Sequence, residues 1–113
     1  MSAYAYGSDE YRAEVVLDAL GDPTRRRVLQ LVRDTGPAAV GAIASELPVS
    51  RPAVSQHLRV LEGAGLVTSE RQGTRHLYAV QPDGLAVLRL WLDGFWDDAL
   101  ARFKRAAEGS ERE

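Results

Sequence analysis

The sequence has no cysteine, only two histidines and no apolar run long enough to span a bilayer. A chain without cysteine has no disulfides, thiolate metal ligands or redox-sensing thiols, as is common in a reducing cytoplasm. The first residues, MSAYAYGSDEYR, lack the basic end and apolar centre of a signal peptide. We therefore expect a cytoplasmic protein without a cofactor and without membrane contact.

The chain also lacks a net positive charge, because 16 acidic residues outnumber 14 basic ones and the net charge is −2 at pH 7. Its distribution is uneven. Residues 1–22 hold five acidic residues and one basic residue, and residues 81–113 hold seven acidic and five basic residues. Residues 23–80 hold eight arginines and four acidic residues. A basic middle suits contact with phosphate, whereas acidic ends are expected to form a different face.

The length of 113 residues and the hydrophobic content of 45% are those of one compact domain with a real core. We expect residues 11–107 to form this domain. Residues 1–10 are small and polar, and residues 108–113 are strongly polar, so both ends are expected to be disordered.

Helical apolar spacing and capping residues predict five helices. Asp22 and Ser50 are candidate N-caps, each followed by a proline in the first helical turn. The expected helices span residues 11–20, 23–35, 40–47, 51–62 and 85–107, and glycine or proline follows each of the first four.

Two strand-like runs, at residues 66–71 and 75–80, flank Gln72-Gly73-Thr74. Gly73 can take a positive φ, so the runs predict a β-hairpin. Two strands alone are only marginally stable, so the hairpin must pack on the helices. The predicted fold is mainly α with a β-hairpin wing: a winged helix-turn-helix of five helices and two strands.

The stretch VGAIASELPVSRPAVSQHLRVL, residues 40–61, predicts the helix-turn-helix itself. On a helical wheel, Val54, Leu58 and Leu61 face inward. The outward residues include arginine and glutamine, which pair with guanine and adenine edges in the major groove. The N-terminus capped by Ser50 can also meet a phosphate. The predicted DNA contacts of this helix are Ser50, Arg51, Pro52, Ser55, Gln56, His57 and Arg59.

Other candidate contacts have two interpretations each. On the hairpin, Arg71, Thr74 and Arg75 are predicted to contact a phosphate or the minor groove, although they could simply keep an exposed hairpin soluble. His57, near the inward stripe, is expected to be a packed, hydrogen-bonded histidine, with a phosphate contact as the alternative. Arg25–Arg27 fits a solvated helix face better than a phosphate contact, since three consecutive residues point in different directions.

The last helix is apolar nearly all round in its first half. A helix of this kind is buried on more than one side, and so small a domain cannot cover both sides. We therefore predict a homodimer that uses the last helix together with the acidic first helix. The predicted interface residues are Val15, Val16, Ala19, Leu88, Trp91, Leu92, Phe95, Trp96 and Ala99.

Catalysis and metal binding find little support. Ser50, Ser55 and His57 lie close in sequence, but no orienting carboxylate, oxyanion loop or GxSxG elbow accompanies them. His57 and His76 do not form a metal cluster, which needs three or four converging ligands. The chain is therefore not expected to be an enzyme.

Three runs of the sequence resemble the ArsR/SmtB family of bacterial transcriptional repressors: LGDPTRRRVLQLV, LPVSRPAVSQHLRVLEGAGLV and RQGTRHLYAVQPDGL. The resemblance implies a homodimeric winged helix-turn-helix that represses from a palindromic operator, often near its own gene. It implies an interface of the first and last helices. It also implies DNA contacts at Arg51, Pro52, Ser55, Gln56 and the wing tip, residues 73–75.

The chain departs from the metal-sensing members of that family, which carry cysteines in the third helix or histidines in the last one. Here the third helix is VGAIASEL and the last helix has no histidine, so the non-metal branch fits better. A metal-dependent sensor with an unusual site is one alternative. Another is a winged-helix module for protein interaction or dimerisation that does not bind DNA. The residues do not specify the operator, the regulated genes or an effector.

Overall fold

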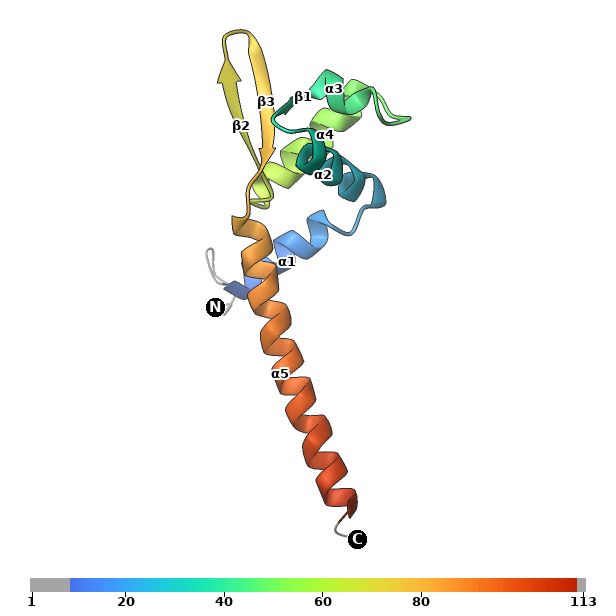
Figure 1. Cartoon of the computed structure of the whole chain (residues 1–113), viewed down its shortest axis with the longest axis vertical. Coiled ribbons are helices and arrows are strands. Elements are labelled where there is room, and N and C mark those ends of the chain that lie inside the picture. Colours follow the sequence, from blue (N-terminus) through green and yellow to red (C-terminus); the bar gives the residue numbers. More distant parts are fainter. Residues whose placement is uncertain (1–8, 112–113) are drawn as a thin grey trace.

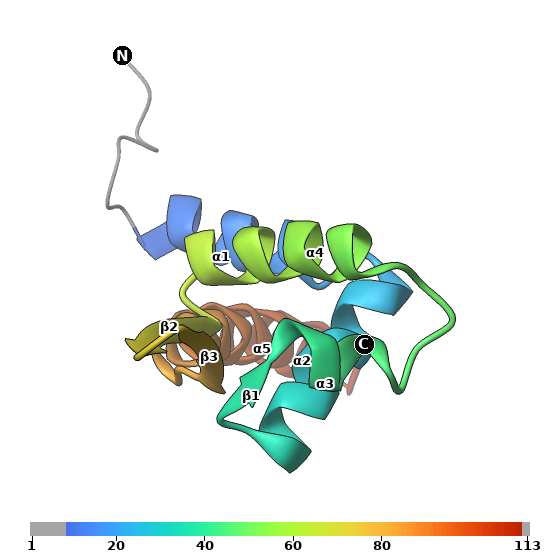
Figure 2. The ribbon, with the colours of Figure 1, turned by 90° about the horizontal axis from the view of Figure 1, so that it is seen from above.

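The structure, a computed structural model, describes residues 9–111 and shows a winged-helix body from which one long helix projects (Figure 1). Figure 2, viewed from above, shows the β2–β3 hairpin to one side of helices α2 and α3. The elements are α1 (Asp9–Ala19), α2 (Pro23–Thr35), β1 (Ala38–Ala39), α3 (Val40–Ala44), α4 (Arg51–Gly63), β2 (Val67–Gln72), β3 (Arg75–Val80) and α5 (Asp83–Glu111).

Helices α2 and α4 begin directly after their predicted N-caps, Asp22 and Ser50. The Asp22 carboxylate accepts a hydrogen bond from the Arg25 backbone N–H at 3.0 Å, and Pro23 opens α2. The Ser50 hydroxyl accepts one from the Ala53 backbone N–H at 3.3 Å. Each cap satisfies a backbone donor that has no partner inside its helix. The second helix of the helix-turn-helix therefore has a fixed first turn.

The sheet has three strands, in the order β1-β3-β2, and this corrects the prediction of two. Strand β1 pairs antiparallel with β3, with Ala38 opposite Tyr78 and Ala39 opposite Leu77. Alanine has low strand propensity, and two residues are too few to show alternation, so no strand could be predicted there. Since β1 is so short, β3 extends well beyond it toward the hairpin turn.

The core lies between the helix-turn-helix and the base of the hairpin. Val54, Leu58 and Leu61 of α4 are fully buried, and they pack with Ile43 of α3 and Leu66 just before β2. The inward stripe predicted for the fourth helix is therefore confirmed. Complete burial of three side chains on one face fixes which residues of α4 remain outside.

Helix α5 has 29 residues, so it is about 43 Å long at 1.5 Å per residue. The molecule measures 69 × 34 × 19 Å, and its radius of gyration is 18.8 Å, whereas a compact chain of this length would have about 13 Å. Only the first part of α5 lies beside α1 and the body (Figure 1). Among residues 9–111, no helix is long and apolar enough to cross a membrane.

The ends of the chain differ from the expected boundaries where the structure describes them. Helix α1 already begins at Asp9, and α5 continues to Glu111 instead of ending near residue 107. The expected disordered tail is therefore helical over residues 108–111, because a single glycine, Gly109, does not stop a helix that is already established. The remaining residues of the two predicted disordered ends, 1–8 and 112–113, lie outside the described part.

Candidate nucleic-acid interface

The outward face of α4 carries the residues predicted to contact DNA. Arg51, Pro52, Gln56 and Arg59 are exposed, and Ser55 is half-buried. Ser50, just before the helix, is exposed as well. The opposite face of α4 is closed by the core, so this surface is presented on a rigid element.

Two of these side chains are linked on the helix surface. The Arg59 Nη2 donates a hydrogen bond to Gln56 Oε1 at 3.0 Å, one helical turn away. The link restrains both side chains and leaves the Gln56 amide N–H groups able to donate. A glutamine held in this way suits a base edge, and the arginine beside it adds positive charge.

His57 lies at the edge of the packed face and is half-buried. Its packing agrees with the prediction, but the expected hydrogen bond is not found at Nδ1, which is buried and has no partner within the described residues. The pKa of Asp22 is lowered, first by the hydrogen bond from the Arg25 backbone N–H and to a smaller extent by the charge of His57.

The wing is the hairpin of β2 and β3, in which Gln72 pairs with Arg75 and Gly73 takes a φ of +63°. The positive φ favours glycine at this turn. Arg71, Thr74 and Arg75 are exposed. Arg71 pairs with His76, so strand alternation sends its side chain to the opposite face from Arg75. Arg71 and Arg75 therefore lie on opposite faces of the hairpin.

The base of the wing is attached to α4, the second helix of the helix-turn-helix. The Ser69 hydroxyl of β2 donates a hydrogen bond to Glu62 Oε2 of α4 at 2.7 Å. Tyr78 of β3 is only 6% exposed. Burial, with a smaller contribution from the negative charge of Glu62, raises the pKa of the Tyr78 hydroxyl. These contacts fix the wing relative to α4.

A groove of about 450 Å³ separates α3 from the outer part of β3, where β1 no longer pairs. It brings together Arg51 of α4 and Thr74 and Arg75 of the wing, as expected of a shared DNA surface. Two lining residues, Gly41 and His76, were not predicted. His76 is exposed, and its ring lies 4.9 Å from that of Tyr78.

The arginine cluster at residues 25–27 has a structural role that the sequence did not suggest. Arg25 Nη1 donates to the Ala19 carbonyl at 3.2 Å, and Arg26 Nη1 donates to the Leu20 carbonyl at 2.6 Å. Both bonds satisfy carbonyl groups at the C-terminal end of α1. Arg25 and Arg26 therefore brace the α1–α2 corner.

The predicted dimer surface is only partly available to a partner. Val16 and Ala19 are each 1% exposed and belong to the chain's own core, which corrects their assignment to an interface. Helical periodicity placed them on an apolar face but could not tell which neighbour covers that face. Val15, Leu88 and Trp91 are half-buried. Leu92, Phe95, Trp96 and Ala99 are exposed.

No group of three or more histidine, cysteine, aspartate or glutamate side chains within the described residues could hold a metal ion. The groups that gather beside α4 and the wing are instead guanidinium, amide and hydroxyl donors, which suit phosphate and base edges.

Comparisons with known proteins agree with this geometry. A family model described as a helix-turn-helix domain matches residues 20–70. The chain is 53% identical over 85 residues to the HTH-type transcriptional regulator Rv2034 of Mycobacterium tuberculosis, covering 75% of this chain and 78% of the relative.

Solved structures share the fold. An ArsR-like transcriptional regulator from Rhodococcus sp. RHA1 is 31% identical, with a TM-score of 0.72 over 87% of this chain and 94% of that one. The homodimeric winged helix-turn-helix DNA-binding domain Mb0332 from Mycobacterium bovis is 27% identical, with a TM-score of 0.62 over 87% of this chain and 92% of that one. The chain therefore belongs to the ArsR family of winged helix-turn-helix proteins and is a DNA-binding transcriptional regulator.

Proposed function

We propose that the protein acts as a homodimer that binds a palindromic operator and represses transcription from it in the cytoplasm. The observation that carries the DNA-binding part is the exposed row of Pro52, Gln56 and Arg59 on α4, opposite a fully buried face of the same helix. Recognition helices of helix-turn-helix proteins present such a row to the major groove.

The apolar surface of α5 supports the dimer. Leu90, Phe95, Trp96 and Phe103 are large apolar side chains that are 68%, 63%, 65% and 71% exposed. A large exposed apolar surface of this kind marks an interface. The Mycobacterium bovis domain of the same fold is homodimeric, which supports pairing through copies of this chain.

A two-fold dimer explains a palindromic operator. Two α4 helices related by a two-fold axis meet two half-sites that repeat in inverted order, with centres about 34 Å apart, one turn of DNA. A dimer seated on such a site would compete with RNA polymerase, and the resemblance to a repressor family supports repression. The third helix without cysteine and α5 without histidine favour a signal other than a metal ion.

The test begins with selection of bound duplexes from a random pool, followed by footprinting of the enriched sequence. We expect an inverted repeat, a protected region on both half-sites and one dimer per duplex by analytical ultracentrifugation. A reporter gene behind the operator should be less active when the protein is present. A single asymmetric site bound by a monomer would contradict the dimer, and an unchanged or activated reporter would contradict repression.

A further inference from the structure

The groove between α3 and the free edge of β3 places a residue of the reading helix beside the wing. Arg51, at the first position of α4, lines the same groove as Thr74, Arg75 and His76. Both arginines are exposed. Among the residues that the structure places around the groove, none is acidic. Arg51 and Arg75 therefore line one groove that has no carboxylate among its lining residues.

Gly41 determines where the Arg51 side chain lies. A Cβ added to Gly41 would overlap the Arg51 guanidinium, with its Cζ only 2.9 Å away. The side chain therefore lies across the start of α3, toward the groove, and not straight out from α4. Gly41 has no positive φ, so a side chain at this position would disturb the Arg51 guanidinium and not the backbone.

Arginine binds phosphate through two parallel N–H donors, and such contacts set the orientation of a protein on DNA. We propose that Arg51 and Arg75 hold one and the same backbone phosphate of the DNA in this groove, and that Gly41 is the positioning residue that makes room for Arg51. Arg51 is then a phosphate contact that couples the reading helix to the wing, and the base contacts belong to Gln56 and its neighbours.

This inference rests on the proposed binding of an operator, and the experiment separates the two. The first measurement is the dissociation constant of the wild-type protein for the selected operator, by fluorescence anisotropy. If no duplex binds, the operator proposal and this inference both fail. If the operator binds, duplexes with one neutral methylphosphonate at successive positions then locate each phosphate contact.

The decisive comparison uses Arg51→Ala and Arg75→Ala on these duplexes. On the natural duplex each substitution should weaken binding roughly tenfold, because each removes a charge-assisted phosphate contact. At one methylphosphonate position per half-site, the wild-type protein should bind more weakly, and neither substitution should weaken binding any further. Two outcomes would refute the shared phosphate. In the first, the two substitutions lose their effect at different methylphosphonate positions. In the second, Arg51→Ala keeps its effect at every position.

Base selectivity gives an independent readout. Arg51→Ala should weaken binding to the operator and to a scrambled duplex by similar factors, with the magnitude of the salt slope reduced by about one. A loss confined to particular base pairs would instead make Arg51 a base contact. Gln56→Ala is the matched comparison on the same helix, and its effect should depend on the base pair it faces.

Gly41→Ala tests the positioning role. It should weaken operator binding by a factor close to that of Arg51→Ala, with an unchanged or slightly raised melting temperature, because only the end of a flexible side chain must shift and alanine favours a helix. Gly63→Ala is the matched control, since a Cβ there meets nothing within 4 Å. Unchanged operator affinity in Gly41→Ala would show that Gly41 does not position Arg51.

Discussion

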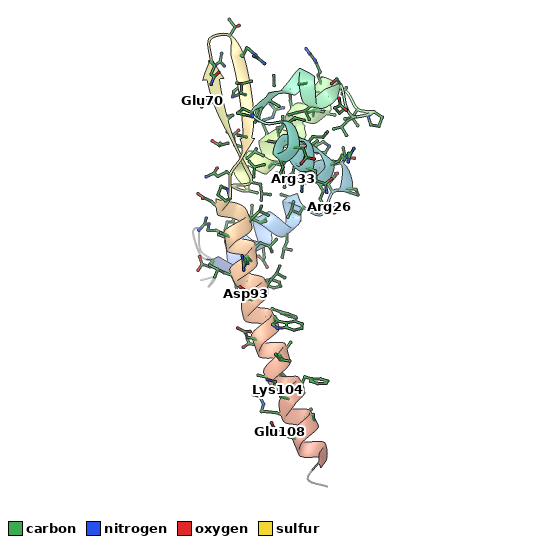
Figure 3. The ribbon with its side chains drawn as sticks, viewed as in Figure 1. Arg26, Arg33, Glu70, Asp93, Lys104 and Glu108 are labelled. Carbon is green, nitrogen blue, oxygen red and sulfur yellow. The ribbon has the colours of Figure 1, made fainter. Side chains whose placement is uncertain are left out.

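The winged-helix body, residues 20–80, and the helix α5 that projects from it are built differently. In the body, apolar side chains such as Leu58 and Leu66 are fully enclosed by their own chain. On α5, the large side chains Phe95, Trp96 and Phe103 are more than half exposed. Figure 3 shows Arg26 and Arg33 on the body, and Asp93, Lys104 and Glu108 spaced along α5.

The difference shows which part of the fold one chain can complete. The body closes its own core, so the DNA-facing side of α4 is held in place within a single chain. Helix α5 keeps its apolar surface in water unless a second molecule covers it. A change in the body should therefore alter folding, and a change on the outer part of α5 should alter association.

The largest effect should come from the body. Leu58→Ala removes a fully buried side chain from the centre of α4, and such changes cost about 2–5 kcal/mol through lost burial and a residual cavity. Denaturant unfolding followed by circular dichroism measures the loss. Leu58→Met, which nearly conserves volume, should cost less than about 1.5 kcal/mol. Equal losses in the two variants would mean that packing at this position is not limiting.

The next effect should come from α5. In Trp96→Glu, a carboxylate replaces an exposed indole, and the dimer loses two such indoles, each worth about 1.5 kcal/mol when buried against a partner. We expect the dimer to weaken by roughly 100-fold, with the helical circular dichroism of the body retained. Sedimentation at several concentrations measures it. Arg102→Glu, also exposed on α5, is the control and should leave the dimer intact. A Trp96→Glu protein that dimerises normally would place the interface elsewhere.

The same contrast explains what the sequence could predict. Helix α4 was predictable because its cap, its proline and its inward stripe are all local signals. The inward stripe, Val54, Leu58 and Leu61, is fully buried in the structure. Strand β1 was not predictable, because two alanines form a strand only when β3 offers an edge. The sequence also could not assign Val16 and Ala19 to the core, since periodicity identifies a face but not what covers it.

The site shows the same limit. The side chains that face outward from α4 follow from the helical period, whereas the groove at Gly41 and His76 depends on how β3 passes α3. The opposite directions of Arg71 and Arg75 follow from the hairpin register, which the sequence leaves open by one residue.

A smaller effect should follow from the cap of α4. Ser50→Ala removes the hydroxyl that accepts from the Ala53 N–H and should cost about 1 kcal/mol of stability. Ser50→Asp keeps a capping oxygen, so its stability should match the wild type. Its added negative charge at the DNA-facing end of α4 should nevertheless weaken operator binding. Thermal melts measure the stability of both variants, and fluorescence anisotropy measures their operator affinity. If Ser50→Asp bound the operator as tightly as the wild type, Ser50 would not be part of the DNA-binding surface.

The smallest effect should be a pH dependence at the α1–α2 corner of the body. The pKa of Asp22 is lowered from its ordinary 3.8, chiefly by the hydrogen bond from the Arg25 N–H. A carboxyl whose pKa is lower in the folded state contributes stability above its unfolded pKa, and this contribution disappears as the pH falls through the folded value. Asp22→Asn keeps a capping oxygen without the charge. The wild type should therefore be slightly more stable than Asp22→Asn above about pH 5, and the gap should close as the pH falls below about 4. Urea unfolding of both proteins across that range measures the gap. A gap that stays constant down to acid pH would show that the carboxylate charge contributes nothing to the cap, and that the hydrogen bond to Arg25 acts through the oxygen alone.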